Sequence, residues 1–263
     1  MKNKEEKKFR LGVVLSGGGT RGFAHVGFLK ALNEEGIYPD IISGASAGSI
    51  AGALYADGYT PEEMAKFFKE SKLRKYIEFV KPNGGMIKLS GLMKMLATGL
   101  KAKTFEELKT PLYIAVCNLN KGEVEYISKG SLVKFVIASS TIPGLFQPAI
   151  IEDNQYVDGG TMDNLPILPL EGKCECIIGQ YVNPIIPMDK IGSLVQIVDR
   201  TMHMMMVPDV RNKRSRFDML VEPAELSKYG LLSVKDRDKI IEIGYKATKK
   251  ALKSWERKSE FIR

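Results

Sequence analysis

Cysteine and histidine are scarce in this sequence of 263 residues, which contains three cysteines and two histidines. The cysteine count is odd, and only one residue separates Cys174 from Cys176, a spacing that suits neither a zinc knuckle nor a C-x-x-C redox motif. Disulfide bonds are also unnecessary, because a chain of this length with 44% hydrophobic residues can bury a sizeable core. We therefore predict reduced cysteines in a cytoplasmic protein.

Long apolar runs are also missing. The first eight residues are rich in charge, and no apolar stretch of the signal-peptide kind follows them. Residues 11–15 form the first apolar run, which is far too short to cross a bilayer, and no later run is long enough. The sequence predicts a charged, solvated tail over residues 1–8 and a single domain over residues 9–263.

Basic residues outnumber acidic ones, 39 to 31, which gives a formal net charge of +8. Such an excess is compatible with nucleic acid, with an anionic membrane surface, or simply with solubility. The basic residues concentrate at 2–10, 211–216 and 246–258, but there is no zinc finger, no aromatic RNA-binding pattern and no helix-turn-helix signature. Nucleic acid is thus disfavoured, whereas peripheral contact with an anionic membrane stays open, as does the oligomeric state.

Apolar strand patterns alternate with helix patterns along the chain. Residues 10–16 predict a buried strand, and after a glycine-rich turn apolar residues at helical spacing continue as far as Gly36. Residues 41–43 predict a second, parallel strand and residues 49–55 a second helix. Further strands are predicted at 111–118, 123–127, 155–157, 176–182 and 218–222, and further helices from Thr60, from Thr104, and at 132–140, 191–206 and 236–255. This order predicts a three-layer α/β fold, in which helices flank both faces of a mostly parallel central sheet.

The most informative stretch is Gly44-Ala45-Ser46-Ala47-Gly48, which stands between the second strand and the second helix. A serine at such a turn has a strained backbone, so only very small residues fit beside it, and all four neighbours are Gly or Ala. The hydroxyl then stands clear of the sheet, at the positive end of the following helix. The pattern predicts a nucleophile, although a plain glycine-rich turn containing a serine has the same composition.

The first strand runs into another glycine-rich stretch, which has three interpretations. Gly17, Gly19 and Gly22 match the G-x-G-x-x-G fingerprint of dinucleotide-binding folds, but the acidic residue that this fingerprint needs after the second strand is replaced by the Ser46 turn. The second interpretation is an oxyanion hole, in which backbone amides stabilise a negative carbonyl oxygen while Arg21 adds positive potential or fixes the loop. The third is a tight helix entry without a chemical role.

A serine needs a base before it becomes a useful nucleophile. Ser46, Asp158 and His203 occur in the order of an α/β-hydrolase triad, but His203 falls in a methionine-rich helical run, and His25 has the position of a packing histidine. Asp158 is the better candidate, because it ends a short strand and two glycines after it leave room for close approach to the serine. The same Asp-Gly pair is also a frequent signal for a hairpin turn.

Two apolar segments are candidates for binding an acyl chain. Residues 86–100 are rich in leucine and methionine with few charges, which suits either a mobile amphipathic flap or an ordinary core helix. Pro143, Leu145 and Phe146 lie in the loop that follows the helix predicted at 132–140. We predict that these three residues line the substrate groove.

Taken together, the three motifs resemble the patatin-like phospholipase family. In chain order they are Gly17-Gly18-Gly19-Thr20-Arg21-Gly22, Gly44-Ala45-Ser46-Ala47-Gly48 and Asp158-Gly159-Gly160. The segment 139–148 is similar as well, and the resemblance covers roughly residues 10–225. It implies that Ser46 is the nucleophile, that Asp158 is its base in a Ser–Asp dyad, and that the backbone of residues 17–22 forms the oxyanion hole.

The resemblance further implies hydrolysis of fatty-acyl esters of lipids through an acyl-enzyme, with no metal and no cofactor. Two other functions are compatible with the same motifs. An acyltransferase would pass the acyl group to another alcohol or thiol, and a lipid- or nucleotide-binding regulator would carry an idle serine.

Overall fold

The computed structural model of the chain describes residues 8–71, 89–187, 191–192, 194–230 and 234–263. Apart from Lys8, the predicted tail lies outside this part of the chain, as do residues 86–88 of the apolar segment. The strands are β1 (Phe9–Leu15), β2 (Ile41–Ala45), β3 (Leu112–Asn118), β4 (Glu123–Ile127), β5 (Ala149–Ile151), β6 (Asn154–Asp158), β7 (Cys174–Gln180) and β8 (Met219–Val221). The α-helices are α1 (Ala24–Glu34), α2 (Ala47–Ala56), α3 (Pro61–Glu70), α4 (Ser90–Gly99), α5 (Leu132–Ser139), α6 (Leu194–Lys213) and α7 (Arg237–Ser254).

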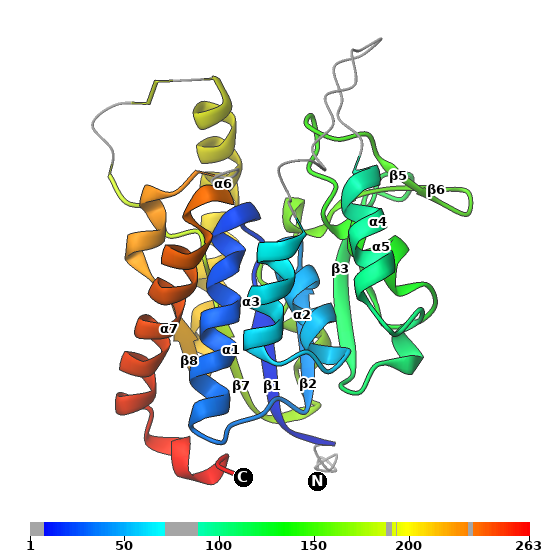
Figure 1. Ribbon diagram of the computed structural model, residues 1–263. Helices are drawn as coiled ribbons and strands as arrows, with labels where there is room; N and C mark the ends of the chain where they lie inside the picture. Colours follow the sequence, from blue (N-terminus) through cyan, green and yellow to red (C-terminus); the bar gives the residue numbers. More distant parts are fainter. Residues whose placement is uncertain (1–7, 72–88, 188–190, 193, 231–233) are drawn as a thin grey trace, which may run out of the picture.

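The strands form one sheet with a parallel centre. Its order is β5-β6-β3-β2-β1-β7-β8, with β4 as an additional partner of β3. Strands β3, β2, β1, β7 and β8 pair in parallel with one another, whereas β4, β5 and β6 are antiparallel to their partners. Helices α1, α2, α3 and α7 lie in front of the central strands (Figure 1). The predicted α/β fold with a mostly parallel central sheet is confirmed.

Neighbouring residues of the central strand β1 enter two different cores, one on each face of the sheet. Val13 and Leu15 belong to the larger core, which also contains Leu29 of α1 and Leu54 of α2. Val14 belongs to the smaller core, which is completed by side chains of the segment 165–170 and of α6. Alternate side chains of β1 thus enter opposite cores, as expected of a strand that is covered on both faces. The ends of the central strands therefore lie between two layers of packed side chains.

Local sequence signals set several element boundaries as predicted. Thr60 caps α3, because its hydroxyl accepts a hydrogen bond from the Glu63 amide and the Glu63 carboxylate accepts one from the Thr60 amide. Pro61 occupies the first helical position, where its missing amide hydrogen costs nothing. Strand β4 has the predicted bounds, and α5 ends one residue before the predicted position.

Other elements differ from the expectation. The helix after the glycine-rich stretch begins as a 3₁₀ turn over Gly19–Phe23, and Gly19 has a φ of 54°, outside the α-helical region. The helix expected from Thr104 is a single 3₁₀ turn, since Leu108 already has an extended backbone. Helix α6 continues through Pro208, beyond its predicted end, and the three-residue strand β5 was too short to predict.

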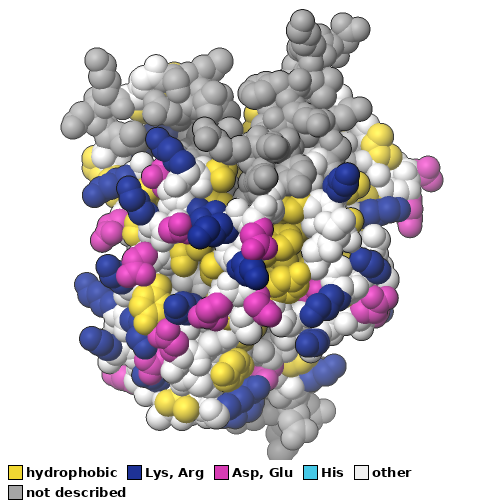
Figure 2. Space-filling model, in the orientation of Figure 1, with side chains coloured by type: hydrophobic (Ala, Val, Ile, Leu, Met, Phe, Trp, Pro, Cys, Tyr) yellow, Lys and Arg dark blue, Asp and Glu magenta, His cyan; other side chains and the backbone are white. Residues whose placement is uncertain are grey.

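Charge is mixed rather than uniformly basic on the face that Figure 2 shows, where Lys and Arg side chains alternate with Asp and Glu. Part of the basic segment 246–258 is paired: Lys249 and Lys258 both contact Glu35, and Arg257 contacts Asp218 at 2.6 Å. Contact with an anionic membrane therefore stays a prediction. Within the described ranges, no helix combines the length and apolarity that crossing a bilayer requires.

Candidate active site

The sheet topology brings two strand ends together. Ala115 of β3 pairs with Ala45, the last residue of β2, and the next residue, Val116, pairs with Asp158, the last residue of β6. Strand β4 pairs with both of these β3 residues as well, so it must occupy the other edge of β3. Strands β2 and β6 thus lie end to end along one edge, and Ser46, directly after β2, meets Asp158.

Ser46 occupies the turn between β2 and α2 with a φ of 50° and a ψ of −121°. Few residues other than glycine adopt a positive φ, so the turn is strained. A Cβ on Gly44 would lie 2.6 Å from the Gly48 carbonyl oxygen, and a Cβ on Gly48 would lie 2.1 Å from that of Leu15. Both distances are far below ordinary contact, so the turn closes only with glycine at these two positions.

Ser139, the last residue of α5, fixes the backbone of this turn. Its hydroxyl donates a hydrogen bond to the Ala115 carbonyl oxygen at 2.8 Å and accepts one from the Ser46 amide, also at 2.8 Å. The Ser139 side chain is completely buried. It therefore ties the strained turn to β3 through two hydrogen bonds that solvent cannot replace.

The Ser46 hydroxyl donates a hydrogen bond to Asp158 Oδ2 at 2.5 Å, and both residues are buried. The other carboxylate oxygen accepts the Gly160 amide at 2.8 Å. Burial raises the pKa of Asp158 from 3.8 to about 6, against the opposing effects of the Ser46 and Gly160 hydrogen bonds and of the His203 charge. At neutral pH this carboxylate is mostly ionised, yet it is a stronger base than an ordinary aspartate.

The glycine-rich stretch lies against the serine turn. A Cβ on Gly17 would come within 3.0 Å of Ser46 Cβ, and one on Gly22 within 2.4 Å of Ala47 Cβ. Neither glycine can carry a side chain unless the two loops separate. The backbone of the stretch therefore packs directly beside the nucleophile turn.

Two amides of this stretch have no hydrogen-bond acceptor among the described residues. The Gly17 amide donates to the Asn164 carbonyl oxygen at 3.2 Å. Among the hydrogen bonds between described residues, none is donated by the amides of Gly18 or Gly19. Gly19 also lines the same cavity as Ser46. Unpaired backbone amides are the kind of donor that can stabilise an oxygen with developing negative charge, and the oxyanion hole over residues 17–22 stays a prediction.

Arg21 fixes the loop from the other side. Its Nε donates to the Tyr229 carbonyl oxygen at 2.7 Å, and its Nη1 donates to Asn183 Oδ1 at 3.1 Å. Asn183 in turn donates to the Gly17 carbonyl oxygen at 2.6 Å. The side chain lines a second cavity rather than the one that contains Ser46, so of the two roles considered for Arg21, the geometry favours fixing the loop.

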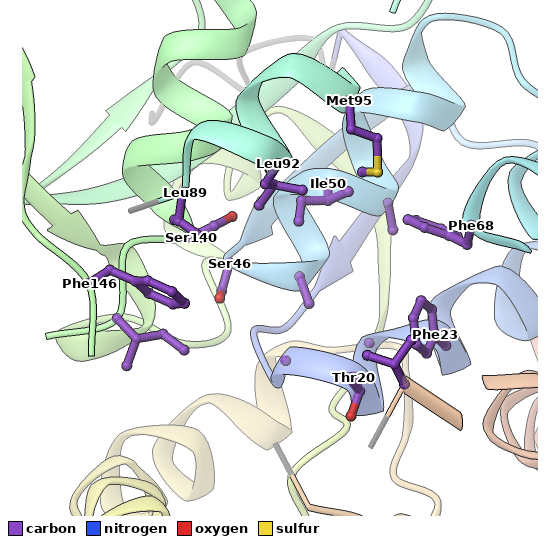
Figure 3. A pocket seen from close by; sticks show the side chains of 16 residues that line it. Thr20, Phe23, Ser46, Ile50, Phe68, Leu89, Leu92, Met95, Ser140 and Phe146 are labelled. Atoms are coloured by element: carbon purple, nitrogen blue, oxygen red, sulfur yellow. The ribbon is translucent and has the colours of Figure 1, made fainter. Parts of the chain in front are cut away.

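An apolar cavity of about 160 Å³ opens beside Ser46. Its walls come from the glycine-rich stretch, the first turns of α2, helix α4 and the loop after α5. Figure 3 shows Ser46 between Phe146 on one side and Ile50 on the other, with Phe23 and Phe68 across the cavity. The latter two rings pack edge to face with their centres 5.3 Å apart. The cavity can hold part of an acyl chain next to the serine.

The predicted groove residues divide into two groups. Phe146 lines the cavity together with Ile142. These two residues are joined by a turn, in which the Phe146 amide donates to the Ile142 carbonyl oxygen at 3.0 Å and Gly144 has a φ of 78°. Pro143 and Leu145 do not line this cavity, so their part in a substrate groove stays a prediction. In the segment 86–100, Leu89, Leu92 and Met95 line the cavity.

The two histidines lie apart from the hydrogen bond between serine and aspartate. His25 is fully buried, and its Nε2 donates to the Ser16 carbonyl oxygen at 2.8 Å. Burial lowers its pKa to about 4, despite hydrogen bonds to Ser16 and Gln180, so it is neutral at pH 7 and supports the start of the glycine-rich stretch. His203 lies on α6 and lines the second cavity, while Ser46 contacts Asp158 directly with no histidine between them.

Two further site residues escape prediction from the sequence. Ser139 opens the segment 139–148 that resembles the family, but it is far from Ser46 in the chain, and no local signal records its hydrogen bond to the Ser46 turn. Asn164 inserts its side chain between the two loops: a Cβ on Gly17 would lie 2.3 Å from Asn164 Oδ1, and one on Gly160 would lie 2.6 Å from it. The only feature of the sequence that points to Asn164 is its position in the polar loop after Asp158.

The family model described as "Patatin-like phospholipase" matches residues 13–171, a span that includes all three motifs. The chain belongs to the patatin-like phospholipase family. This patatin-like chain is 28% identical over 274 residues to Lysophospholipase NTE1 of Coccidioides immitis. The alignment covers 92% of the chain and 17% of that relative. The chain is 35% identical over 168 residues to Lysophospholipase nte1 of Aspergillus fumigatus, covering 62% of the chain and 11% of that relative. The chain thus spans less than a fifth of either relative.

The patatin-like fold also appears in a solved structure. The crystal structure of VipD from Legionella pneumophila superposes with a TM-score of 0.63 at 17% identity, covering 94% of this chain and 67% of VipD. At this identity the likeness concerns the fold alone. The family inferred from the three motifs is confirmed.

Proposed function

We propose that the protein is a serine hydrolase that cleaves fatty-acyl esters of phospholipids or lysophospholipids through Ser46 and Asp158. The observation that carries the proposal is the 2.5 Å hydrogen bond from Ser46 to Asp158 beside an apolar cavity. Membership of the patatin-like phospholipase family and the lysophospholipase names of the relatives agree with this reaction.

In the first step, Asp158 Oδ2 takes the hydroxyl proton while Ser46 Oγ forms a bond to the carbonyl carbon of the ester. The carbonyl oxygen becomes negative, and the free amides of Gly18 and Gly19 stabilise it. The tetrahedral intermediate then expels the alcohol, which leaves with the proton held on Asp158. Ser46 remains acylated.

In the second step, a water molecule gives a proton to Asp158 and attacks the acyl carbon. Collapse of this intermediate breaks the bond to Ser46 Oγ, which recovers the proton from Asp158, and the fatty acid is released. The direct serine–aspartate hydrogen bond supports this two-residue scheme, because one carboxylate within reach of the hydroxyl can serve both steps.

The first experiment labels the purified protein with a fluorophosphonate probe and locates the modified residue by peptide mass spectrometry. We expect the label on Ser46 and its loss in Ser46→Ala. Hydrolysis of p-nitrophenyl butyrate should fall by at least about 10³-fold in Asp158→Asn, because the base is removed. Asp153→Asn is the matched control, since Asp153 is an exposed aspartate in the turn before β6.

Other outcomes decide against the proposal. A folded protein that neither reacts with the probe nor hydrolyses esters would be a binding protein. Loss of turnover in His203→Gln together with retention in Asp158→Asn would make the histidine the base. Formation of a new ester when glycerol is added, in place of free fatty acid, would identify an acyltransferase.

A further inference from the structure

A second cavity also borders the glycine-rich stretch. Its volume is about 120 Å³. Thr20 and Gly22 line the apolar cavity, whereas Arg21 between them lines the second. The Arg21 guanidinium is anchored by the Tyr229 carbonyl oxygen and by Asn183. The glycine-rich stretch therefore lines both cavities.

Basic residues from three separate segments line this second cavity. Arg21 comes from the glycine-rich stretch, Arg200 and His203 from α6, and Lys228 from the segment after β8. No Asp or Glu occurs among the described residues that line it. Moreover, none of the ion pairs between described residues involves Arg200 or Lys228. Such a lining suits a small anion.

The second cavity begins at the loop that passes the nucleophile. Arg21 lines it, and the next residue, Gly22, packs so closely on Ala47 that a Cβ on Gly22 would lie 2.4 Å from Ala47 Cβ. A group bound beside Arg21 would therefore lie near an ester held at Ser46. In a glycerophospholipid the phosphate is joined to the acyl ester by the short glycerol backbone, so it is the substrate group that can reach this cavity.

We propose that this cavity, lined by Arg21, Arg200, His203 and Lys228, binds the phosphate of the substrate head group while the acyl chain occupies the apolar cavity. The inference rests on the proposed function, because it assumes that an ester lies at Ser46. Guanidinium and ammonium groups are the side chains best suited to phosphate oxygens, with short, charge-assisted hydrogen bonds. The cavity would thus make the enzyme prefer phosphate-bearing esters over neutral glycerides.

The test compares two substrates that differ only in the phosphate: octanoyl lysophosphatidic acid and octanoyl monoglyceride. The cavity variant combines Arg200→Gln with Lys228→Gln, and leaves Arg21 in place because it fixes the glycine-rich stretch. The control variant combines Lys246→Gln with Lys250→Gln, two exposed lysines of α7 that do not line the cavity, and removes the same net charge. Calorimetry with glycerol phosphate and with inorganic phosphate measures binding without turnover.

We expect the cavity variant to lower kcat/KM for the phosphate substrate about tenfold relative to the monoglyceride, mainly through KM, and the control to keep this ratio within about twofold. Glycerol phosphate should bind the unmodified protein and bind the cavity variant about tenfold more weakly. An equal fall of the ratio in both variants would show a general effect of net charge and overturn the proposal.

The proposal is equally overturned if neither the ratio nor glycerol phosphate binding changes. Binding of inorganic phosphate alone, with an unchanged substrate ratio, would assign the cavity to a free ion instead of a head group. If the unmodified protein hydrolyses neither ester, the proposed function fails, and the calorimetry still decides whether the cavity binds the glycerol phosphate group.

Discussion

Replacing Asp158 by asparagine should inactivate the protein and at the same time stabilise it. The pKa of this carboxyl rises from 3.8 to about 6 because the group is buried beside Ser46. A rise of this size means that ionised Asp158 costs the folded state about 3 kcal/mol at neutral pH. Asparagine has the same shape and can still bond Ser46 and the Gly160 amide, but it carries no charge. We therefore expect Asp158→Asn to gain up to about 3 kcal/mol in free energy of unfolding at pH 7.5.

The pH dependence of this gain has a definite sign. Because the folded pKa is raised, the folded state takes up its proton first as the pH falls through 6, and the cost of the charge disappears towards pH 4. Urea denaturation at pH 7.5 and at pH 4.5 measures the difference, with Asp153→Asn as the control for loss of one aspartate. A variant that is less stable at pH 7.5, or whose gain is the same at both pH values, would refute the burial argument.

Two further predictions concern activity. In the unmodified protein, kcat/KM for p-nitrophenyl butyrate should rise about tenfold from pH 5 to pH 7 and then level off, because the carboxylate form of Asp158 is required; a profile that is flat down to pH 5 would contradict the raised pKa. Ser139→Ala should lower kcat about 10- to 100-fold with a smaller effect on KM, since the Ser46 turn loses its tie to β3 while the acyl cavity is untouched. Steady-state kinetics tests this, and an unchanged kcat would mean that the turn holds without the serine.

The sequence could predict those parts of the site whose geometry depends on residues within a few positions of one another. The strain at Ser46 requires Gly44 and Gly48, so the turn leaves a local pattern that can be recognised without a structure. The same holds for the cap of α3 at Thr60, where the three residues that matter stand within four positions. The order of strands and helices was likewise sufficient for the α/β class, since buried parallel strands are continuously apolar.

The parts that could not be predicted depend on contacts across the chain. Ser139 bonds Ser46 across 93 positions, and no local pattern records that partner. The composition of the loop after α5 also does not record which of its residues line the cavity, where Ile142 and Phe146 are found and Leu145 is not. Helix α6 continues through Pro208, where the local preference is for a helix to stop, and no nearby residue pattern records that continuation.

The contact between Ser46 and Asp158 depends on the register of β6 on β3 more than on either sequence motif. Strand β6 reaches β3 through only three residue pairs, and β5 on its far side adds three more. A slip of one residue in this short hairpin would turn the Asp158 side chain to the opposite face of the sheet, away from Ser46. Gly159 helps to prevent such a slip, because a Cβ there would lie 2.1 Å from the Ala115 carbonyl oxygen, and only glycine lets the chain leave β6 at that position. The glycine after the aspartate therefore sets where β6 ends, and so where the base stands relative to the nucleophile.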